Sequence, residues 1–377
     1  MERRTFLRAG LGGVAAAGLT APLASGLLLA DRGSTRWRIA AEPIRLSSNE
    51  NPLGLSDAAR EAVIASLGEA NCYPGPYRQA VIDALAAKHE VRPEQIVLGA
   101  GSTEILQMAV QARGPNATVI VADPTFEDVP RYAERIGIRV EKVPLRADYS
   151  HDLERMREVA ARSSGPVLVY ICNPNNPTGT VTPSSEIDAW IEEAPESIQF
   201  VVDEAYYEYA ADPRYRSAQR WVYTKPNVLV VRTFSKIYAM AGMRLGYAVA
   251  HSGTAEHLAR WAAANNANTL ALIAARASLG DREFERKSLE VNRRGREILT
   301  KCLDELGLEH LPSHTNFVMH RINGDLPTYN RRMEEHGILV GRPFPPMVTH
   351  SRVSVGLPEE MERFAETLRM FRKRGWV

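Results

Sequence analysis

Short apolar runs alternate with stretches of helical periodicity through most of the chain, a pattern typical of an α/β sheet. Five of these runs are continuous rather than alternating, as expected for strands that are buried on both faces. They are residues 95–99, 118–122, 167–171, 199–202 and 228–232. The pattern therefore predicts an α/β domain built on a mixed, mostly parallel sheet.

Each predicted strand ends in a cluster of small or polar residues. The clusters occupy residues 100–104, 123–126, 173–179, 203–206 and 233–236. In open α/β sheets, ligands bind outside the carboxyl ends of the strands. We therefore expect these five segments to line one crevice.

The pattern changes near Leu272, where a long helical stretch begins that is strongly charged from Asp281 to Leu306. Separated strands follow around residues 315–321, 338–341 and 352–355, which together predict a second, smaller α+β domain. We predict four segments in all. These are a signal segment at 1–30, an N-terminal arm that is part of the small domain at 31–60, a large domain at 61–271 and a small C-terminal domain at 272–377.

The first thirty residues have the layout of a twin-arginine signal segment. Arg3-Arg4-Thr5-Phe6-Leu7 precedes an uncharged, Ala/Gly/Leu-rich stretch from Ala9 to Ala30. The alternative is an amphipathic first helix, but the glycines and prolines of the stretch oppose it. We expect periplasmic or secreted protein, with cleavage before Asp31 or an uncleaved anchor as alternatives, and cytoplasmic protein if the leader does not function. No second long apolar run occurs, so we expect no membrane contact for the mature body.

Composition narrows the classes of partner. The chain has 46 basic and 45 acidic residues, a balance that gives no reason to expect nucleic acid or an anionic membrane as partner. Cys72, Cys172 and Cys302 are too scattered for a metal site or a disulfide framework, and we interpret them as structural. No metal site is predicted.

The candidate chemistry centres on Ser235-Lys236, followed by Arg244. A lysine is required wherever an aldehyde cofactor is held as a Schiff base, and a nearby arginine can hold a phosphate. Taken alone, the pair is a weak signal, because a lone lysine is far more often a solvated surface residue than a Schiff base. Context at the other strand ends adds weight to the chemical interpretation.

Three other strand ends carry matching groups. Asp203, in an Asp-Glu-Ala-Tyr run, could keep a pyridine nitrogen protonated, although such a run can also be a plain acidic turn. Asn176, in the Pro-rich loop 173–179, can donate to a phenolate oxygen, whereas a surface turn is the alternative. The Ala100-Gly101-Ser102-Thr103 turn opens a helix and could cradle a phosphate, or simply fit a tight turn.

Together these motifs, in this order, resemble the fold-type-I pyridoxal 5'-phosphate (PLP) aminotransferases of class I/II, which have the aspartate-aminotransferase fold. The likeness is nearest to the histidinol-phosphate aminotransferase group. The matching segments are Asn49-Glu50-Asn51-Pro52-x-Gly54, Tyr73-Pro74, Gly101-Ser102-x-Glu104, Pro124-Thr125-Phe126, residues 173–179, 203–206 and 235–244, Thr315-Asn316-Phe317 and residues 352–356.

The resemblance implies a role for each matching residue. Lys236 would carry PLP and shuttle the proton of the substrate, Asp203 would pair with the ring nitrogen, and Tyr206 and Asn176 would bind the phenolic oxygen. Phe126 would stack on the ring. The phosphate would be held by Ser102, Thr103, Ser235 and Arg244, with Tyr73 reaching in from the second subunit of a homodimer. Arg352 would bind the substrate carboxylate, and Asn51 is a further substrate contact.

The predicted function is amino-group transfer between an L-amino acid and a 2-oxo acid. A PLP-dependent decarboxylase, eliminase or cyclase of the same fold is the first alternative, because fold alone does not fix the reaction. A non-catalytic PLP-binding module is the second. Arg342 lies in a segment that departs from the family pattern, and it could bind an acidic or phosphorylated substrate tail or lie in a surface loop.

Overall fold

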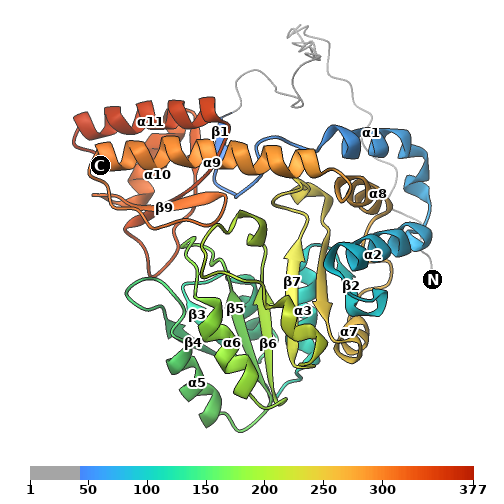
Figure 1. Ribbon diagram of the computed structural model, residues 1–377. Coiled ribbons are helices and arrows are strands. Elements are labelled where there is room, and N and C mark those ends of the chain that lie inside the picture. The colour runs from blue at the N-terminus through green and yellow to red at the C-terminus, as the bar shows by residue number, and fades with distance from the viewer. Residues whose placement is uncertain (1–42) are drawn as a thin grey trace, which may run out of the picture.

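The computed structural model describes residues 43–377, so the predicted signal segment lies outside the described residues. A seven-stranded mixed sheet has the order β2-β8-β7-β6-β5-β3-β4, and β8 alone runs antiparallel to its neighbours (Figure 1). Its strands are β2 (Ile96–Gly99), β3 (Thr118–Asp123), β4 (Arg139–Pro144), β5 (Val167–Cys172), β6 (Ile198–Asp203), β7 (Val228–Thr233) and β8 (Gly246–Ala250).

Helices cover both faces of this sheet because alternate strand residues point to opposite sides. One core contains side chains of α1 (Asp57–Ala65), α2 (Gly75–His89), α5 (Leu153–Arg162), α6 (Ser184–Glu193) and α8 (Thr269–Ser278). The other contains those of α3 (Ser102–Ala112), α4 (Asp128–Arg135) and α7 (Ser252–Ala259). The result is the predicted α/β architecture with a mostly parallel sheet.

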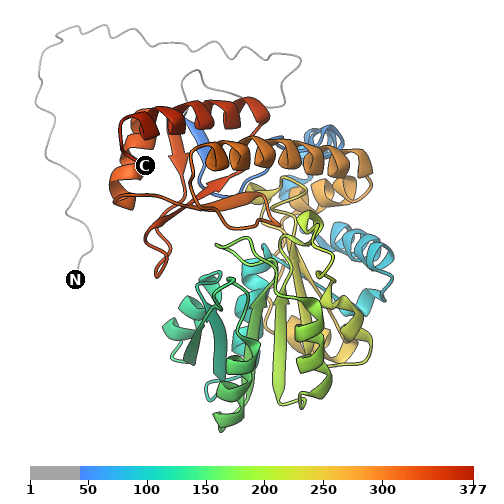
Figure 2. The same ribbon diagram turned by 60° about the vertical axis from the view of Figure 1, so that its left-hand side comes forward.

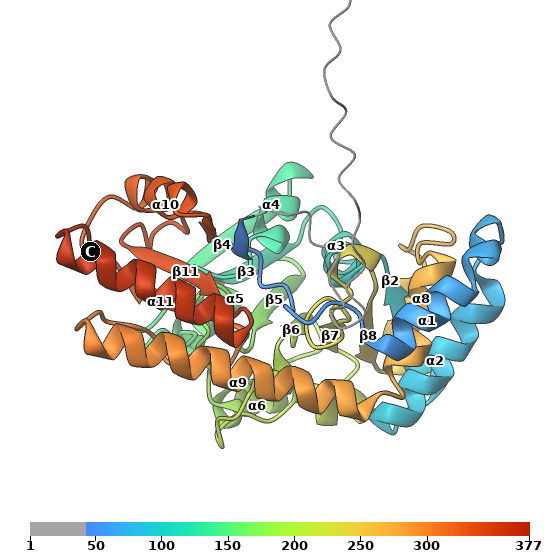
Figure 3. The ribbon, with the colours of Figure 1, turned by 90° about the horizontal axis from the view of Figure 1, so that it is seen from above.

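A third core belongs to the C-terminal part of the chain, which lies over the sheet in Figure 2. Its elements are α9 (Arg282–Glu305), β9 (Phe317–Arg321), α10 (Leu326–Glu335), β10 (Ile338–Val340), β11 (His350–Ser354) and α11 (Pro358–Lys373). The early strand β1 (Ile44–Leu46) joins them by pairing with β10 in parallel. Seen from above, α9 lies beside α11 and reaches to the neighbourhood of α8 (Figure 3). The bounds of the four predicted segments stay a prediction.

The five predicted internal strands are all present, within one residue of their expected bounds, but two strands of the sheet were missed. Strand β4 is an edge strand in which only Val143 is buried among its apolar residues, so it has no continuous apolar run. Strand β8 is short and reads Gly-Tyr-Ala-Val-Ala, directly after the Arg244 segment. Strand β4 therefore lacks the signal that marked the others, whereas β8 is an apolar run, buried at every position, that the sequence prediction did not include.

A buried ion pair fixes the end of the central strand β6. Glu204 follows Asp203 and accepts a hydrogen bond from Arg232 Nη2 at 2.8 Å, with both side chains buried. Its other oxygen, Oε1, accepts from the backbone N–H of Ala218. Because consecutive residues point to opposite faces of a strand, this anchoring of Glu204 leaves Asp203 directed to the face that carries α3 and α4.

Candidate active site

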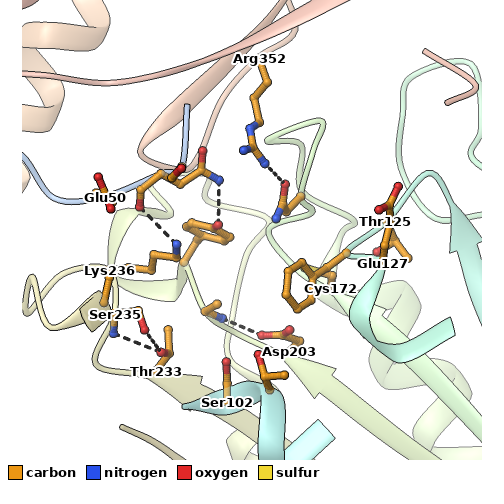
Figure 4. A pocket seen from close by; sticks show the side chains of 18 of the residues that line it. Glu50, Ser102, Thr125, Glu127, Cys172, Asp203, Thr233, Ser235, Lys236 and Arg352 are labelled. Atoms are coloured by element: carbon orange, nitrogen blue, oxygen red, sulfur yellow. Dashed lines mark hydrogen bonds between the residues drawn. The ribbon is translucent and has the colours of Figure 1, made fainter. Parts of the chain in front are cut away.

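A cavity of about 390 Å³ opens at the carboxyl ends of the strands, between the sheet and the C-terminal elements. All five predicted polar clusters contribute to its lining. The lining includes Ser102, Thr103, Thr125, Phe126, Cys172, Asn176, Asp203, Tyr206, Thr233, Ser235, Lys236 and Arg244, together with Ser48, Asn49, Glu50, Glu127, Arg342, Phe344 and Arg352. In Figure 4, Arg352 enters opposite Ser102, with Lys236 and Asp203 between them.

The floor of the cavity has the form of a phosphate cradle. Gly101 adopts φ +79° at the start of α3, and no side chain caps this end of the helix. The guanidinium group of Arg244 packs so closely against Gly101 that a Cβ at this position would collide with Nη2. Uncapped N–H groups at a helix N-terminus attract anions, and Ser102, Ser235 and Arg244 all line the same cavity. These residues therefore fit the phosphate group of PLP.

Asp203 provides a buried carboxylate at the end of β6. Its Oδ2 accepts a hydrogen bond from the Tyr170 hydroxyl at 2.8 Å, and Oδ1 accepts one from the Ala205 N–H. Burial raises the pKa of Asp203 to about 6, although the bond from Tyr170 opposes the shift. A cationic partner would offset the burial cost of this carboxylate, and a protonated pyridine nitrogen is such a partner.

Lys236 presents a perturbed amine to the cavity. Its Nζ donates to the backbone carbonyl of Asn49 at 3.2 Å. Burial lowers the pKa of Lys236 to about 8, and the nearby charges of Arg352 and Arg244 act in the same direction. The carboxylates of Glu50 and Asp203 oppose the shift. A minor but appreciable fraction of the amine is therefore neutral, and so nucleophilic, near physiological pH, and this fraction grows as the pH rises through 8.

Tyr206 and Asn176 are linked to the remaining cavity groups. The Tyr206 hydroxyl accepts from Asn49 Nδ2 at 3.0 Å, and its ring contacts Phe317 edge-on with the centroids 5.3 Å apart. Burial raises the pKa of Tyr206 above its ordinary range, so the hydroxyl remains a donor. Asn176 Oδ1 accepts from Arg352 Nη1 at 2.7 Å, which orients the amide.

Arg352 is a buried guanidinium with spare donor capacity. Nη1 is bonded to Asn176 and Nη2 donates to the Ser47 carbonyl at 2.8 Å, whereas Nε has no partner within residues 43–377. Burial lowers the pKa of Arg352 to about 10, which still leaves it charged at neutral pH. A buried cation with a free N–H is suited to a carboxylate.

Two predicted residues do not lie in the cavity. Asn51 was predicted to contact substrate, but its Nδ2 donates to the Ile237 carbonyl and the Ser288 hydroxyl, both at 3.0 Å, which holds it outside the lining. Tyr73 has an exposed fraction of 81% and lies outside the lining of its own chain. All other predicted site residues, including Phe126 and Arg342, line the cavity.

Asn49 and Glu127 are cavity residues that sequence reasoning missed. Asn49 belongs to the same Asn-Glu-Asn-Pro motif as Asn51, has a positive φ of 55°, and donates from its side chain to the Tyr206 hydroxyl. Glu127 follows Phe126 directly, and this adjacency was the available signal. In the described part of the chain, no group of three His, Cys, Asp or Glu could hold a metal ion.

The family model for aminotransferase class I and II matches residues 41–368. The chain belongs to the class I and II aminotransferases. This aminotransferase is 39% identical over 328 residues to histidinol-phosphate aminotransferase 1 of Nitrosococcus oceani, covering 86% of this chain and 88% of the relative. It is thus a PLP-dependent aminotransferase similar to the histidinol-phosphate enzymes.

Solved structures agree with this assignment of the aminotransferase. A histidinol-phosphate aminotransferase from Sinorhizobium meliloti in complex with PLP has a TM-score of 0.81 and 28% identity, covering 88% of this chain and 91% of the other. A mutant aspartate aminotransferase from Thermus thermophilus has a TM-score of 0.74 and 26% identity, covering 87% and 92%. The predicted aspartate-aminotransferase fold is confirmed.

The lowered pKa of Lys236 makes the reactivity of the cofactor-free aminotransferase depend on pH. Because only the neutral amine attacks a carbonyl, the rate of reaction with added PLP should rise with pH through a midpoint near 8. Arg352→Gln removes a cation that lowers the pKa of Lys236, so the midpoint for this variant should lie at a higher pH than that of the wild type. Stopped-flow absorbance measures the reaction rate of both proteins.

Lys236→Ala is the control for this measurement and should show no such phase. A wild-type midpoint close to the ordinary lysine value of 10.5 would contradict the interpretation of Lys236 as a desolvated amine.

Proposed function

We propose that this chain transfers an amino group between an L-amino acid and a 2-oxo acid, with PLP bound through Lys236. The observation that carries the proposal is the meeting, in one cavity, of an amine with a pKa of about 8, the buried carboxylate of Asp203 and the cradle at Gly101. These three groups match the aldehyde, the ring nitrogen and the phosphate of PLP respectively. When bound, PLP supplies a carbonyl that condenses with amines and a ring that accepts electron density from the substrate Cα.

Different residues of the chain are assigned to proton transfer and to orientation of the cofactor. Lys236 Nζ would hold PLP and, when free, would take the proton from the substrate Cα and return it to the adjacent carbon of the cofactor. Asp203 would keep the ring nitrogen protonated, which would favour this proton removal. Tyr206 and Asn176 would donate to the phenolic oxygen, and Phe126 would cover one face of the ring.

Arg352 is proposed to bind the anionic group next to the reacting carbon of the substrate. Its unpaired Nε and its position across the cavity from the phosphate cradle support this role. The anion is a carboxylate in an amino acid and would be a phosphate in a substrate such as histidinol phosphate. Similarity to named histidinol-phosphate aminotransferases supports a substrate that carries an imidazole.

Lys236→Ala tests the reaction type. In the wild type, mixing with an amino acid should convert the absorbance of the bound pyridoxal form into that of the pyridoxamine form, and a 2-oxo acid should reverse the change. The variant should bind PLP but lose at least roughly a thousandfold in rate, because it lacks the group that moves the proton.

Lys301→Ala, an exposed lysine on α9, is the matched control and should react like the wild type. Release of carbon dioxide or ammonia without reversal by the 2-oxo acid would contradict amino transfer and favour the decarboxylase or eliminase alternative.

We further propose a homodimer in which Tyr73 of each subunit completes the phosphate cradle of the other. The exposed fraction of Tyr73 supports this, and so do the exposed Ile64 and Leu67 in the preceding segment. Burying such side chains in a subunit interface would be favourable.

Mixing Lys236→Ala and Tyr73→Phe subunits tests the shared site. Tyr73→Phe alone should weaken PLP binding by about tenfold, since it removes a hydrogen bond to a charged group. In the mixed dimer, one site combines an intact Lys236 with an intact Tyr73, so the mixture should recover activity that neither variant shows at limiting PLP. A monomeric mass by sedimentation, or no recovery, would contradict the proposal.

Export by the twin-arginine route is proposed for the full chain. Arg3-Arg4 and the uncharged stretch up to Ala30 support it, as does the start of the family match at residue 41. Among residues 43–377, no helix has the length and apolarity needed to cross a membrane.

Replacement of both Arg3 and Arg4 by lysine should abolish export and retain the protein in the cytoplasm, because the route reads the arginine pair. Cell fractionation with immunoblotting measures the distribution, and Arg8→Lys is the matched control. An unchanged distribution in the double variant would rule out this route.

A further inference from the structure

Glu127 places a carboxylate in the cavity beyond the cofactor-binding residues. It stands at the start of α4, one residue after Phe126, and lines the same cavity as Lys236. Its Oε2 atom pairs with Arg342 Nη2 at 2.6 Å and with Arg131 Nη2 at 2.5 Å. Oε1 receives only a long contact of 3.4 Å from Arg342 Nη1 within the described part of the chain. Oε1 therefore retains capacity to accept a hydrogen bond.

The partner Arg342 comes from the C-terminal part of the chain, 215 positions away. Its guanidinium carbon lies 4.3 Å from the centre of the Phe344 ring, and that of Arg352 lies 4.5 Å from the same centre. The two arginines thus share one aromatic ring. Glu127 and Arg342 line the same cavity as Arg352, so the side chain of a substrate anchored at Arg352 lies in a cavity that these two residues border.

The pairing with Glu127 changes what Arg342 can bind. An acidic substrate side chain would have to displace Glu127 from the guanidinium and would then lie beside a second carboxylate of like charge. A side chain with an N–H donor, in contrast, can approach Oε1 without breaking the ion pair. Arg342 is therefore not a free receptor for an acidic tail.

We propose that Glu127 is the specificity-determining residue for the substrate side chain. Its Oε1 accepts a hydrogen bond from a side-chain N–H, as an imidazole provides, and its hold on Arg342 disfavours acidic side chains. The inference rests on the proposed function, because it takes Arg352 as the anchor for the substrate anion.

The test uses three carboxylic acids that lack the α-amino group, so that binding requires no reaction. These are imidazole-4-propionate, 3-phenylpropionate and glutarate, titrated calorimetrically into the PLP-loaded protein. The wild type should bind the imidazole acid most tightly and glutarate most weakly. Glu127→Ala removes the acceptor and should weaken the imidazole acid by about tenfold, while changing 3-phenylpropionate by less than about twofold.

Glu127→Gln separates the charge from the acceptor. It keeps an oxygen acceptor but frees Arg342, so the affinity for glutarate should rise by about tenfold. Glu134→Gln, on the same helix and paired with Lys142 at 2.9 Å outside the cavity lining, is the matched control and should leave all three affinities unchanged.

Equal changes for all three acids in the Glu127 variants, or none, would overturn the assignment of specificity to Glu127. Failure of the proposed function has a different signature. In that case the imidazole acid still binds in a Glu127-dependent manner, but neither L-histidine nor histidinol phosphate causes conversion to the pyridoxamine form.

Discussion

The organisation of the site depends on two consecutive carboxylates at the end of β6 that point in opposite directions. Glu204 is held inside the protein by Arg232 and by the Ala218 N–H, whereas Asp203 faces the cavity with only neutral donors. A buried carboxylate that lacks a cation is costly, and the protonated ring nitrogen proposed as its partner would offset this cost. Because β6 is central in the sheet, the neighbouring strand ends are placed relative to Asp203 by backbone hydrogen bonds.

The cost of burying a charge also determines the protonation of Lys236. Its pKa of about 8 lies below the ordinary value of 10.5, so between these values the folded, cofactor-free protein binds fewer protons than the unfolded chain. The group therefore opposes folding most strongly below pH 8, and this opposition fades as the pH rises toward 10.5. The protein tolerates the cost because the neutral amine is the form that reacts. The lowered pKa that makes Lys236 Nζ reactive therefore also lowers the free energy of unfolding.

Sequence reasoning located five of the seven strands of the large sheet and most of the residues that line the cavity, because both follow from local patterns. A buried parallel strand needs a continuous apolar run, and the ends of parallel strands meet at one edge, so Ser102, Asn176 and Lys236 could be grouped in advance. Sequence reasoning did not find the features that depend on the three-dimensional arrangement of the chain. The motif around Asn51 does not say which asparagine lines the cavity, which in the structure is Asn49. The pairing of Glu127 with Arg342 joins residues far apart in the chain, and nothing local marks it.

The pairing of β1 with β10 has a consequence for how the protein is made. Ile44 pairs with Ile338, so a strand near the start of the chain waits through the synthesis of the next 294 residues before its partner exists. At roughly 5–20 residues per second, this delay lasts on the order of 15–60 s. During roughly the last third of that time the nascent chain already contains Lys236 but has no Arg352. On the ribosome, the amine that can capture an aldehyde therefore exists well before the guanidinium proposed to bind the substrate, and the complete site is a property of the finished chain.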